Sequence, residues 1–148
     1  MEVQPDFKDL FELLNKHKVK YVIVGGYALA FHGAPRYTGD MDIFVKPDGA
    51  NAVKIMKALN EFGFGSVGLE TADFEKPNNI IQLGVAPVRV DLITSLTGVT
   101  WDDAFYGCEK GEYGDVPVVF ISRKQFILNK RATGRKQDAA DLEALGEE

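Results

Sequence analysis

Cysteine and histidine are scarce in this chain of 148 residues, which contains one cysteine and two histidines. A single cysteine cannot form an internal disulfide or a cysteine-based zinc site. The histidines, His17 and His32, do not complete a cluster of metal ligands with Cys108. Sparse cysteine is typical of a reducing compartment, so we expect a cytoplasmic protein.

Long apolar runs are missing as well. No stretch of about 18 apolar residues occurs, so a membrane span is not expected. The first eleven residues contain early acids and no apolar core run, which argues against a signal peptide. We therefore expect no membrane partner.

An excess of positive charge is also absent, because the formal net charge is -5. This balance argues against broad, non-specific binding to nucleic acid. One local exception is residues 123–136, which hold six lysines and arginines and no acid. Contact with RNA would be confined to this basic segment, and its alternative role is a solvated helix face.

The composition that remains, with 45% hydrophobic and 26% charged residues, is typical of a soluble globular protein. We predict one domain over residues 1–148, with a core at 18–98 and a C-terminal helical segment at 122–146. Helices and strands alternate, which predicts an α/β (α+β) fold with a mixed β-sheet flanked by helices. The predicted helices cover 6–17, 27–33, 50–62, a short piece after Thr100, and two segments between 122 and 146. The predicted strands lie within 21–26, where two glycines end the strand in a tight turn, and at 40–46, 79–85 and 88–94, with a hairpin around 114–115.

Two details of this prediction are specific enough to test. The helix at 50–62 should turn an inward stripe of four apolar residues toward the sheet: Val53, Met56, Leu59 and Phe62. Residues 66–98 should be β-structure. The basic segment should begin at a helix capped by Ser122 and be interrupted at Gly134.

Three aspartates form the strongest chemical signal. Asp40 and Asp42 are two residues apart in a predicted strand, so both side chains project to the same side. Two ionised carboxylates in a partly buried place are unfavourable unless a cation lies between them. Asp91 shares a strand face with Arg89 and can join the pair if the two strands are neighbours; a plain salt bridge to Arg89 is the alternative. An all-oxygen ligand set of this kind suits Mg²⁺ or Mn²⁺.

A glycine pair supplies a second signal. Gly25 and Gly26 follow a β-branched strand and open a helix, where glycine permits a tight turn and close approach of the backbone. The N–H groups at a helix start favour a phosphate. A phosphate anchor beside a carboxylate-held metal indicates phosphoryl or nucleotidyl transfer.

The two signals together resemble a known family. VGG at 24–26, thirteen intervening residues and DMDI at 40–43 match the signature of the polymerase-β-like nucleotidyltransferases. GGYALAFHG and RYTGDMD resemble the small bacterial and archaeal members, including those related to AbiEii-type toxins. The tail KRATGRKQDAADL is similar to the same group, with a lysine, then an arginine shortly before Asp-x-x-Asp.

The resemblance implies a reaction and a set of roles. Asp40, Asp42 and Asp91 would hold two metal ions, and a hydroxyl would attack the α-phosphate of a nucleoside triphosphate and release pyrophosphate. The residues expected to contact the nucleotide are Gly25, Gly26, Arg36, Thr38, Lys130 and Arg135. For Arg36 the alternative is neutralisation of Asp40, and Thr38 is expected to shape the loop. Asp138 and Asp141 are expected to cap a helix and orient the basic groups.

One departure from the family concerns the residue after the glycines. Many members carry Ser or Thr there, whose hydroxyl contacts phosphate, whereas this chain has Tyr27. We expect that contact to be missing or replaced by backbone N–H groups.

The acceptor is not specified by the sequence. An RNA end, as in a toxin with a cognate antitoxin, a protein hydroxyl and a small molecule all remain open, and a homodimer could complete the acceptor surface. The alternative functions are a nucleotide-binding or interaction module without turnover and a phosphoesterase that uses the same metals.

Overall fold

A six-stranded sheet organises the computed structural model, which describes residues 3–34, 39–63, 68–85 and 88–147. The strand order is β3-β4-β2-β1-β6-β5. The strands are β1 (Tyr21–Val24), β2 (Asp40–Val45), β3 (Ile80–Val85), β4 (Val88–Ile93), β5 (Glu109–Tyr113) and β6 (Val116–Phe120). The helices are α1 (Pro5–Lys16), α2 (Gly25–Phe31), α3 (Gly49–Phe62), α4 (Ala72–Glu75), α5 (Trp101–Tyr106), α6 (Arg123–Thr133) and α7 (Lys136–Ala144).

The sheet is mixed, as the sequence predicts. β2 pairs in parallel with β4 and antiparallel with β1, and β1 pairs in parallel with β6. The β3–β4 and β5–β6 pairs are antiparallel hairpins. β2 therefore lies inside the sheet between β1 and β4, and backbone hydrogen bonds to both neighbours fix the directions in which its side chains point.

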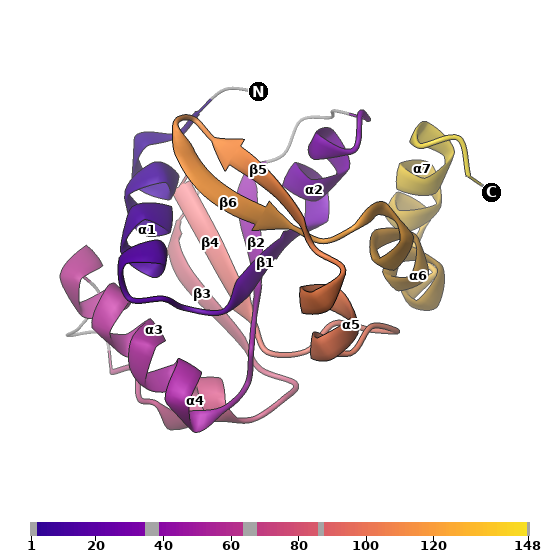
Figure 1. The fold of residues 1–148 in the computed structure, drawn as a ribbon. Coiled ribbons are helices and arrows are strands. Elements are labelled where there is room, and N and C mark those ends of the chain that lie inside the picture. The colour runs from indigo at the N-terminus through magenta and orange to yellow at the C-terminus, as the bar shows by residue number, and fades with distance from the viewer. Residues whose placement is uncertain (1–2, 35–38, 64–67, 86–87, 148) are drawn as a thin grey trace.

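α1 anchors the core on one side of the sheet. Its four buried residues, Phe7, Leu10, Phe11 and Leu14, follow the spacing of one helical face. The ring of Phe11 stacks on Tyr21 of β1 at 5.7 Å, and Phe7 meets Tyr27 of α2 edge-on at 6.0 Å. Figure 1 shows α1 and α3 together at one end of the molecule, with α6 and α7 at the other.

The predicted inward stripe of α3 is wrong in part. Val53 is 45% exposed, and the buried apolar positions are Ala52, Ile55, Ala58 and Leu59. Met56 and Phe62 are only partly buried against the core. A stripe drawn at every third residue drifts around a helix that repeats every 3.6 residues, so it cannot stay on one face over ten residues. Only Leu59 belongs to both stripes.

The prediction of continuous β-structure over 66–98 is also wrong in part, because α4 lies within it. Phe74 of this single turn is completely buried, and Asn79 donates from its side chain to the carbonyl of Asp73. A helix of four residues is too short to show a helical period in sequence. The strands that follow it begin and end within a residue of their predicted bounds.

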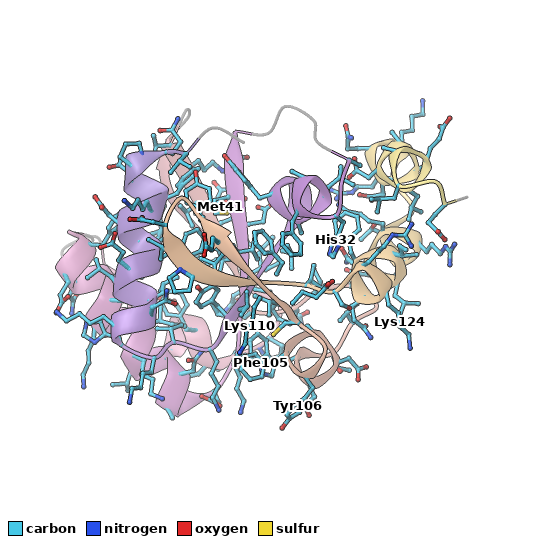
Figure 2. The ribbon with its side chains drawn as sticks, turned by 45° about the horizontal axis from the view of Figure 1, so that its top comes forward. His32, Met41, Phe105, Tyr106, Lys110 and Lys124 are labelled. Atoms are coloured by element: carbon cyan, nitrogen blue, oxygen red, sulfur yellow. The ribbon has the colours of Figure 1, made fainter. Side chains whose placement is uncertain are left out.

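The C-terminal helices begin and end where the sequence predicts. The Ser122 hydroxyl accepts from the backbone N–H of Gln125 and caps α6, and Gly134 ends it with a φ of 64°. α7 then folds back against α6 (Figure 1). Figure 2 shows Met41 of β2 in the interior, whereas Tyr106 and Lys124 lie at the periphery. Over the described ranges, no helix combines the length and apolar character needed to cross a membrane.

Candidate active site

The strand register brings two of the three predicted aspartates side by side. Asp42 on β2 lies directly opposite Asp91 on β4, and Asp40 lies opposite Arg89. Partners in register on adjacent strands point to the same face of the sheet. The side chains of Asp40, Asp42, Arg89 and Asp91 therefore share one face, with Met41 and Val90 buried on the other.

Arg89 holds Asp91 in a bidentate ion pair. Its Nε and one terminal nitrogen each donate to a different oxygen of the Asp91 carboxylate, both at 3.0 Å. The same Nε lies 3.7 Å from Oδ2 of Asp40. The salt bridge that was the alternative reading of Asp91 is therefore present, and it links two of the three carboxylates.

Asp42 lies where a negative charge is unfavourable. Its burial raises its pKa to about 6, and the charges of Asp91 and Asp40 add to that rise. Lys130 and Arg89 oppose the shift without cancelling it. A carboxylate that is ionised at neutral pH in this position is a site where a bound cation would lower the free energy.

Gly25 leaves room for Asp42. It has a φ of 69°, which favours glycine, and a Cβ there would lie 3.1 Å from both Cβ and Cγ of Asp42 and closer still to Oδ2. Val24, the residue before it, is in register with Asp42 across the β1–β2 pair. The glycine turn and the position of Asp42 therefore depend on each other, because a side chain at position 25 would overlap the Asp42 carboxylate.

We predict that Gly25→Ala lowers the free energy of unfolding by more than the usual penalty for a left-handed alanine, about 1–2 kcal/mol, because the new methyl group displaces Asp42. Gly63→Ala is the matched control, since Gly63 has a φ of 105° and open space around its Cβ position. Urea unfolding measures both variants. Equal destabilisation by the two substitutions would show that the contact with Asp42 does not matter.

A cavity of about 510 Å³ connects the glycine turn to the C-terminal helices. Gly25, Asp42, Lys130 and Arg135 all line it, although they come from opposite ends of the chain. Its volume is in the range of small-molecule sites. The rest of the lining comes from the β1 end, the ends of β3 and β4, the segment after β4 and helix α6: Val24, Ile80, Ile93, Ser95, Leu96, Thr97, Asn129, Ala132 and Thr133.

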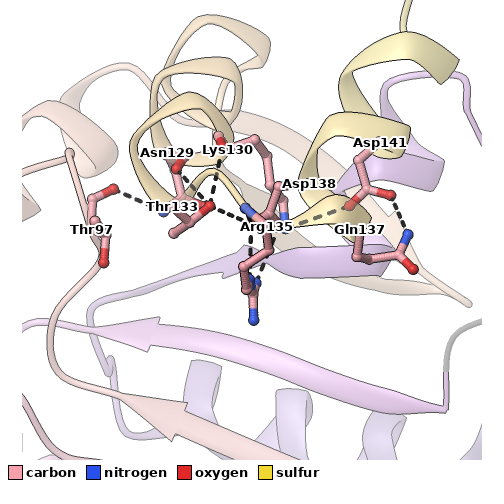
Figure 3. Close-up of polar contacts among 8 residues, drawn as sticks. All are labelled: Thr97, Asn129, Lys130, Thr133, Arg135, Gln137, Asp138 and Asp141. Atoms are coloured by element: carbon pink, nitrogen blue, oxygen red, sulfur yellow. Dashed lines mark hydrogen bonds and ion pairs between the residues drawn. The ribbon is translucent and has the colours of Figure 1, made fainter.

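A buried ion-pair network fixes the basic side of this cavity (Figure 3). Asp138 is completely buried and accepts hydrogen bonds from Lys130 Nζ at 3.1 Å, from the Thr133 hydroxyl and from Arg135 Nε at 2.9 Å. Lys130 is 6% exposed, and its Nζ also lies 3.5 Å from Asp141. Asp138 binds Arg135, as predicted, whereas the contacts of both acids with Lys130 were not predicted.

Asp138 also caps α7. Its carboxylate accepts from the backbone N–H of Arg135, the residue before the helix, and from the Arg135 guanidinium. Burial alone would raise the pKa of Asp138, but the hydrogen bonds from Arg135, Thr133 and Lys130 hold it well below its usual range. Asp138 is therefore a stable anion around which the end of α6 and the start of α7 are arranged.

The other predicted residues fall in different places. Neither Asp40 nor Asp91 lines the cavity, and Gly26 is buried in the first turn of α2. Arg36 and Thr38 lie outside the described residues. The Tyr27 ring packs among Phe7 and Tyr113 and is 6% exposed, so it belongs to the core rather than to the cavity.

The carboxylates of Asp42 and Asp91 are chemically suited to a divalent cation, although Arg89 already binds the carboxylate of Asp91. Two facing carboxylates, one of them with a raised pKa, make an all-oxygen site of the kind that Mg²⁺ and Mn²⁺ use. In the part of the chain that the structure describes, no three acidic, histidine or cysteine side chains already converge as a metal site. Both oxygens of Asp91 are instead bound by Arg89.

Several cavity residues were not predicted from sequence. Thr133 and Asn129 contribute through α6, where Asn129 donates to the carbonyl of Thr97 at 2.8 Å, and Ile80 and Ile93 form a paired apolar wall. No local pattern distinguishes these residues from ordinary helix and strand positions. Only the position of Thr133 directly before Gly134 marks it as a helix end.

Most basic residues of segment 123–136 form ion pairs with acids that lie after it in the chain. Arg123 and Arg131 both contact Glu147, at 3.1 and 3.4 Å, and Lys130 is buried in the network described above. Lys124 is exposed and points outward (Figure 2). Most of the positive charge that the sequence places here is therefore paired with acids of the same chain.

This chain resembles known proteins in structure, whereas the two sequence comparisons found no match. No protein-family model matches the chain, and no curated protein sequence matches it. TM1012 from Thermotoga maritima, assigned as a nucleotidyltransferase, superposes with a TM-score of 0.63 at 16% identity, over 96% of this chain and 93% of its own.

Two further solved structures are of antibiotic-resistance proteins. The lincosamide antibiotic adenylyltransferase LnuA, with lincomycin bound, has a TM-score of 0.57 at 15% identity over 99% of this chain and 98% of its own. The antibiotic-resistance factor ANT(2'')-Ia has a TM-score of 0.59 at 12% identity over 95% of this chain and 80% of its own. This chain thus has the fold of nucleotidyltransferases, with its acids and glycine turn gathered on one side of the sheet.

Proposed function

We propose that this chain is a metal-dependent nucleotidyltransferase that moves a nucleoside monophosphate from a nucleoside triphosphate to a hydroxyl acceptor. The proposal rests on one observation: Gly25, Asp42, Lys130 and Arg135 line the same cavity. A glycine turn, an acid with a raised pKa and two oriented cations are the parts that polyphosphate chemistry requires.

The residues would divide the work as follows. Asp40, Asp42 and Asp91 would hold Mg²⁺ or Mn²⁺, which when bound offsets phosphate charge and acidifies the attacking hydroxyl. Gly25 and Gly26 would seat the β- and γ-phosphates, and Lys130 and Arg135 would face the triphosphate from the opposite wall. The acceptor oxygen forms a bond to the α-phosphorus, the bond to the next phosphate breaks, and pyrophosphate leaves.

A small-molecule acceptor has the most support. The net charge is negative, and four of the six basic residues in the segment that RNA would need are paired with Glu147, Asp138 or Asp141: Arg123, Lys130, Arg131 and Arg135. Two of the structural neighbours are named for antibiotics. A protein hydroxyl remains compatible with the same site, and a toxin acting on RNA ends, with a cognate antitoxin, would need contacts beyond this segment.

The competing proposal is a nucleotide-binding module without turnover. Tyr27 favours it, because this core residue supplies no hydroxyl at the glycine turn. The facing pair Asp42 and Asp91 argues against it, since clustered acids in a partly buried place destabilise a fold that makes no use of them.

The test is incubation of the protein with each labelled nucleoside triphosphate, Mg²⁺ or Mn²⁺, and a panel of aminoglycosides, lincosamides, tRNA and cell extract. We expect label in an acceptor and an equal amount of pyrophosphate. Metal-dependent binding of the nucleotide without either product would favour the module, and release of phosphate without an acceptor would favour a phosphoesterase.

A further inference from the structure

Arg89 occupies the centre of the acidic site, and the proposed reaction gives it no role. Its guanidinium binds both oxygens of Asp91 at 3.0 Å and lies 3.7 Å from Asp40. Arg89 is also in register with Asp40 on the neighbouring strand, so the ion pairs follow from the sheet itself. The register of the sheet therefore places the Arg89 side chain beside these acids.

The charges around Arg89 explain why it lies there. Three carboxylates share this face of the sheet, and the pKa of Arg89 is raised by its hydrogen bonds to Asp91 and further by Asp40 and Asp42. Two other cations act on Asp42, and both are already held by acids of the C-terminal helices: Lys130 by Asp138 and Asp141, and Arg135 by Asp138. Arg89 is thus a cation on this strand face that pairs with Asp91 and lies close to Asp40.

A bidentate arginine and a divalent ion compete for the same carboxylate. Both use the oxygens of Asp91, and two cations a few ångströms apart repel each other. The Arg89 side chain is one-third exposed, whereas that of Asp91 is 13% exposed. The arginine therefore has solvent into which it can turn, and the carboxylate does not have to move.

We propose that Arg89 is the internal counter-cation of the acidic site and releases Asp91 when a divalent metal binds. This inference rests on the proposed function, because it takes Asp91 as a metal ligand. Arg89 is then a positioning residue: it keeps the carboxylates aligned before metal arrives, and its release is a cost included in the measured metal affinity.

The experiment measures Mn²⁺ affinity directly, by electron paramagnetic resonance of the unbound ion, for the wild type and three variants. Arg89→Gln removes the charge and keeps a hydrogen-bonding side chain of similar shape. Arg89→Lys keeps the charge and loses the bidentate fork. Lys57→Gln removes one positive charge from an exposed position on α3 and serves as the control for net charge.

We expect Arg89→Gln to bind Mn²⁺ about tenfold more tightly than the wild type, as the loss of one nearby positive charge predicts. Arg89→Lys should lie between the two, and Lys57→Gln should match the wild type. Without metal, Arg89→Gln should melt at a lower temperature than the wild type, and Mn²⁺ should raise its melting temperature by more.

Two outcomes overturn the inference in distinguishable ways. Equal or weaker Mn²⁺ binding by Arg89→Gln, with label transfer by the wild type intact, would show that Arg89 stays on Asp91 and would leave the proposed function standing. Absence of Mn²⁺ binding by the wild type and by all variants, together with absence of label transfer, would remove both.

Discussion

Asp42→Asn is expected to abolish nucleotide transfer while making the protein more stable at neutral pH. Loss of this carboxylate should lower kcat/KM by about a thousandfold or more, because a bound metal stabilises the charge of the transition state by several kcal/mol. The gain in stability has a separate cause: Asp42 is buried beside Asp91 and Asp40, and its pKa of about 6 reports the cost of ionising it.

The pH dependence of this gain follows from the sign of the shift. The pKa of Asp42 is raised from 3.8, so the folded protein holds the proton more tightly than the unfolded chain. The contribution of Asp42 to stability is largest below about pH 4 and is lost as the pH rises to about 6. At pH 7 the penalty of about 3 kcal/mol is fully present.

Unfolding by urea in metal-free buffer at pH 7 and at pH 4 measures the difference between Asp42→Asn and the wild type. We expect the variant to be more stable at pH 7 by up to about 3 kcal/mol and to lose most of that advantage at pH 4. Asp102→Asn, an exposed acid on α5, is the matched control and should change neither quantity. A variant that loses transfer and also loses stability at pH 7 would contradict the electrostatic explanation.

Asp138→Asn is expected to cause the largest loss of stability. Removal of one partner of a buried ion pair typically costs about 3–5 kcal/mol, because the other charge remains buried. Here Lys130 is 6% exposed, and Asp141 at 3.5 Å would be its remaining acidic contact in the network. Thr133 and Arg135 would lose their charged acceptor at the same time.

The same substitution should weaken nucleotide binding, since Lys130 and Arg135 line the cavity and depend on Asp138 for their orientation. We expect KM for the triphosphate to rise by about tenfold, with a smaller change in kcat. Glu143→Gln is the control, because it neutralises an exposed acid on the same helix.

A double variant separates the buried charge from the packing. Lys130→Met combined with Asp138→Leu removes both charges, and apolar replacement of a buried pair is often neutral or stabilising. Asp141, which is 1% exposed, loses its contact with Lys130 in this variant, so we expect the variant to recover part of the stability that Asp138→Asn loses while remaining weak in nucleotide binding. If the single variant unfolds within about 1 kcal/mol of the wild type, the network does not hold the C-terminal helices as described.

Element prediction succeeded where the signal is local. β4 and β6 follow from β-branched runs, the β5–β6 hairpin follows from its turn at Gly114 and Asp115, and α6 follows from Ser122 and Gly134. The stripe of α3 was wrong because spacing by threes does not follow a helical face, and α4 was missed because one turn carries no periodic pattern. Both errors lie in elements that do not line the site.

The sequence by itself determined which residues could share a face and where the chain could turn. The strand period of two puts Asp40 and Asp42 on one side, and Gly25 permits the close approach that Asp42 requires. These are properties of neighbouring residues and of backbone geometry. They hold whatever the rest of the fold does.

Only the tertiary structure decided which of these local pieces meet. It placed β4 beside β2, so that Asp91 faces Asp42 and Arg89 faces Asp40, and it folded α6 and α7 back so that Lys130 and Arg135 share a cavity with Gly25. The order of strands and the docking of helices depend on burying apolar surface from distant parts of the chain at once. No single segment contains that information, because each segment has several ways to bury its own apolar face.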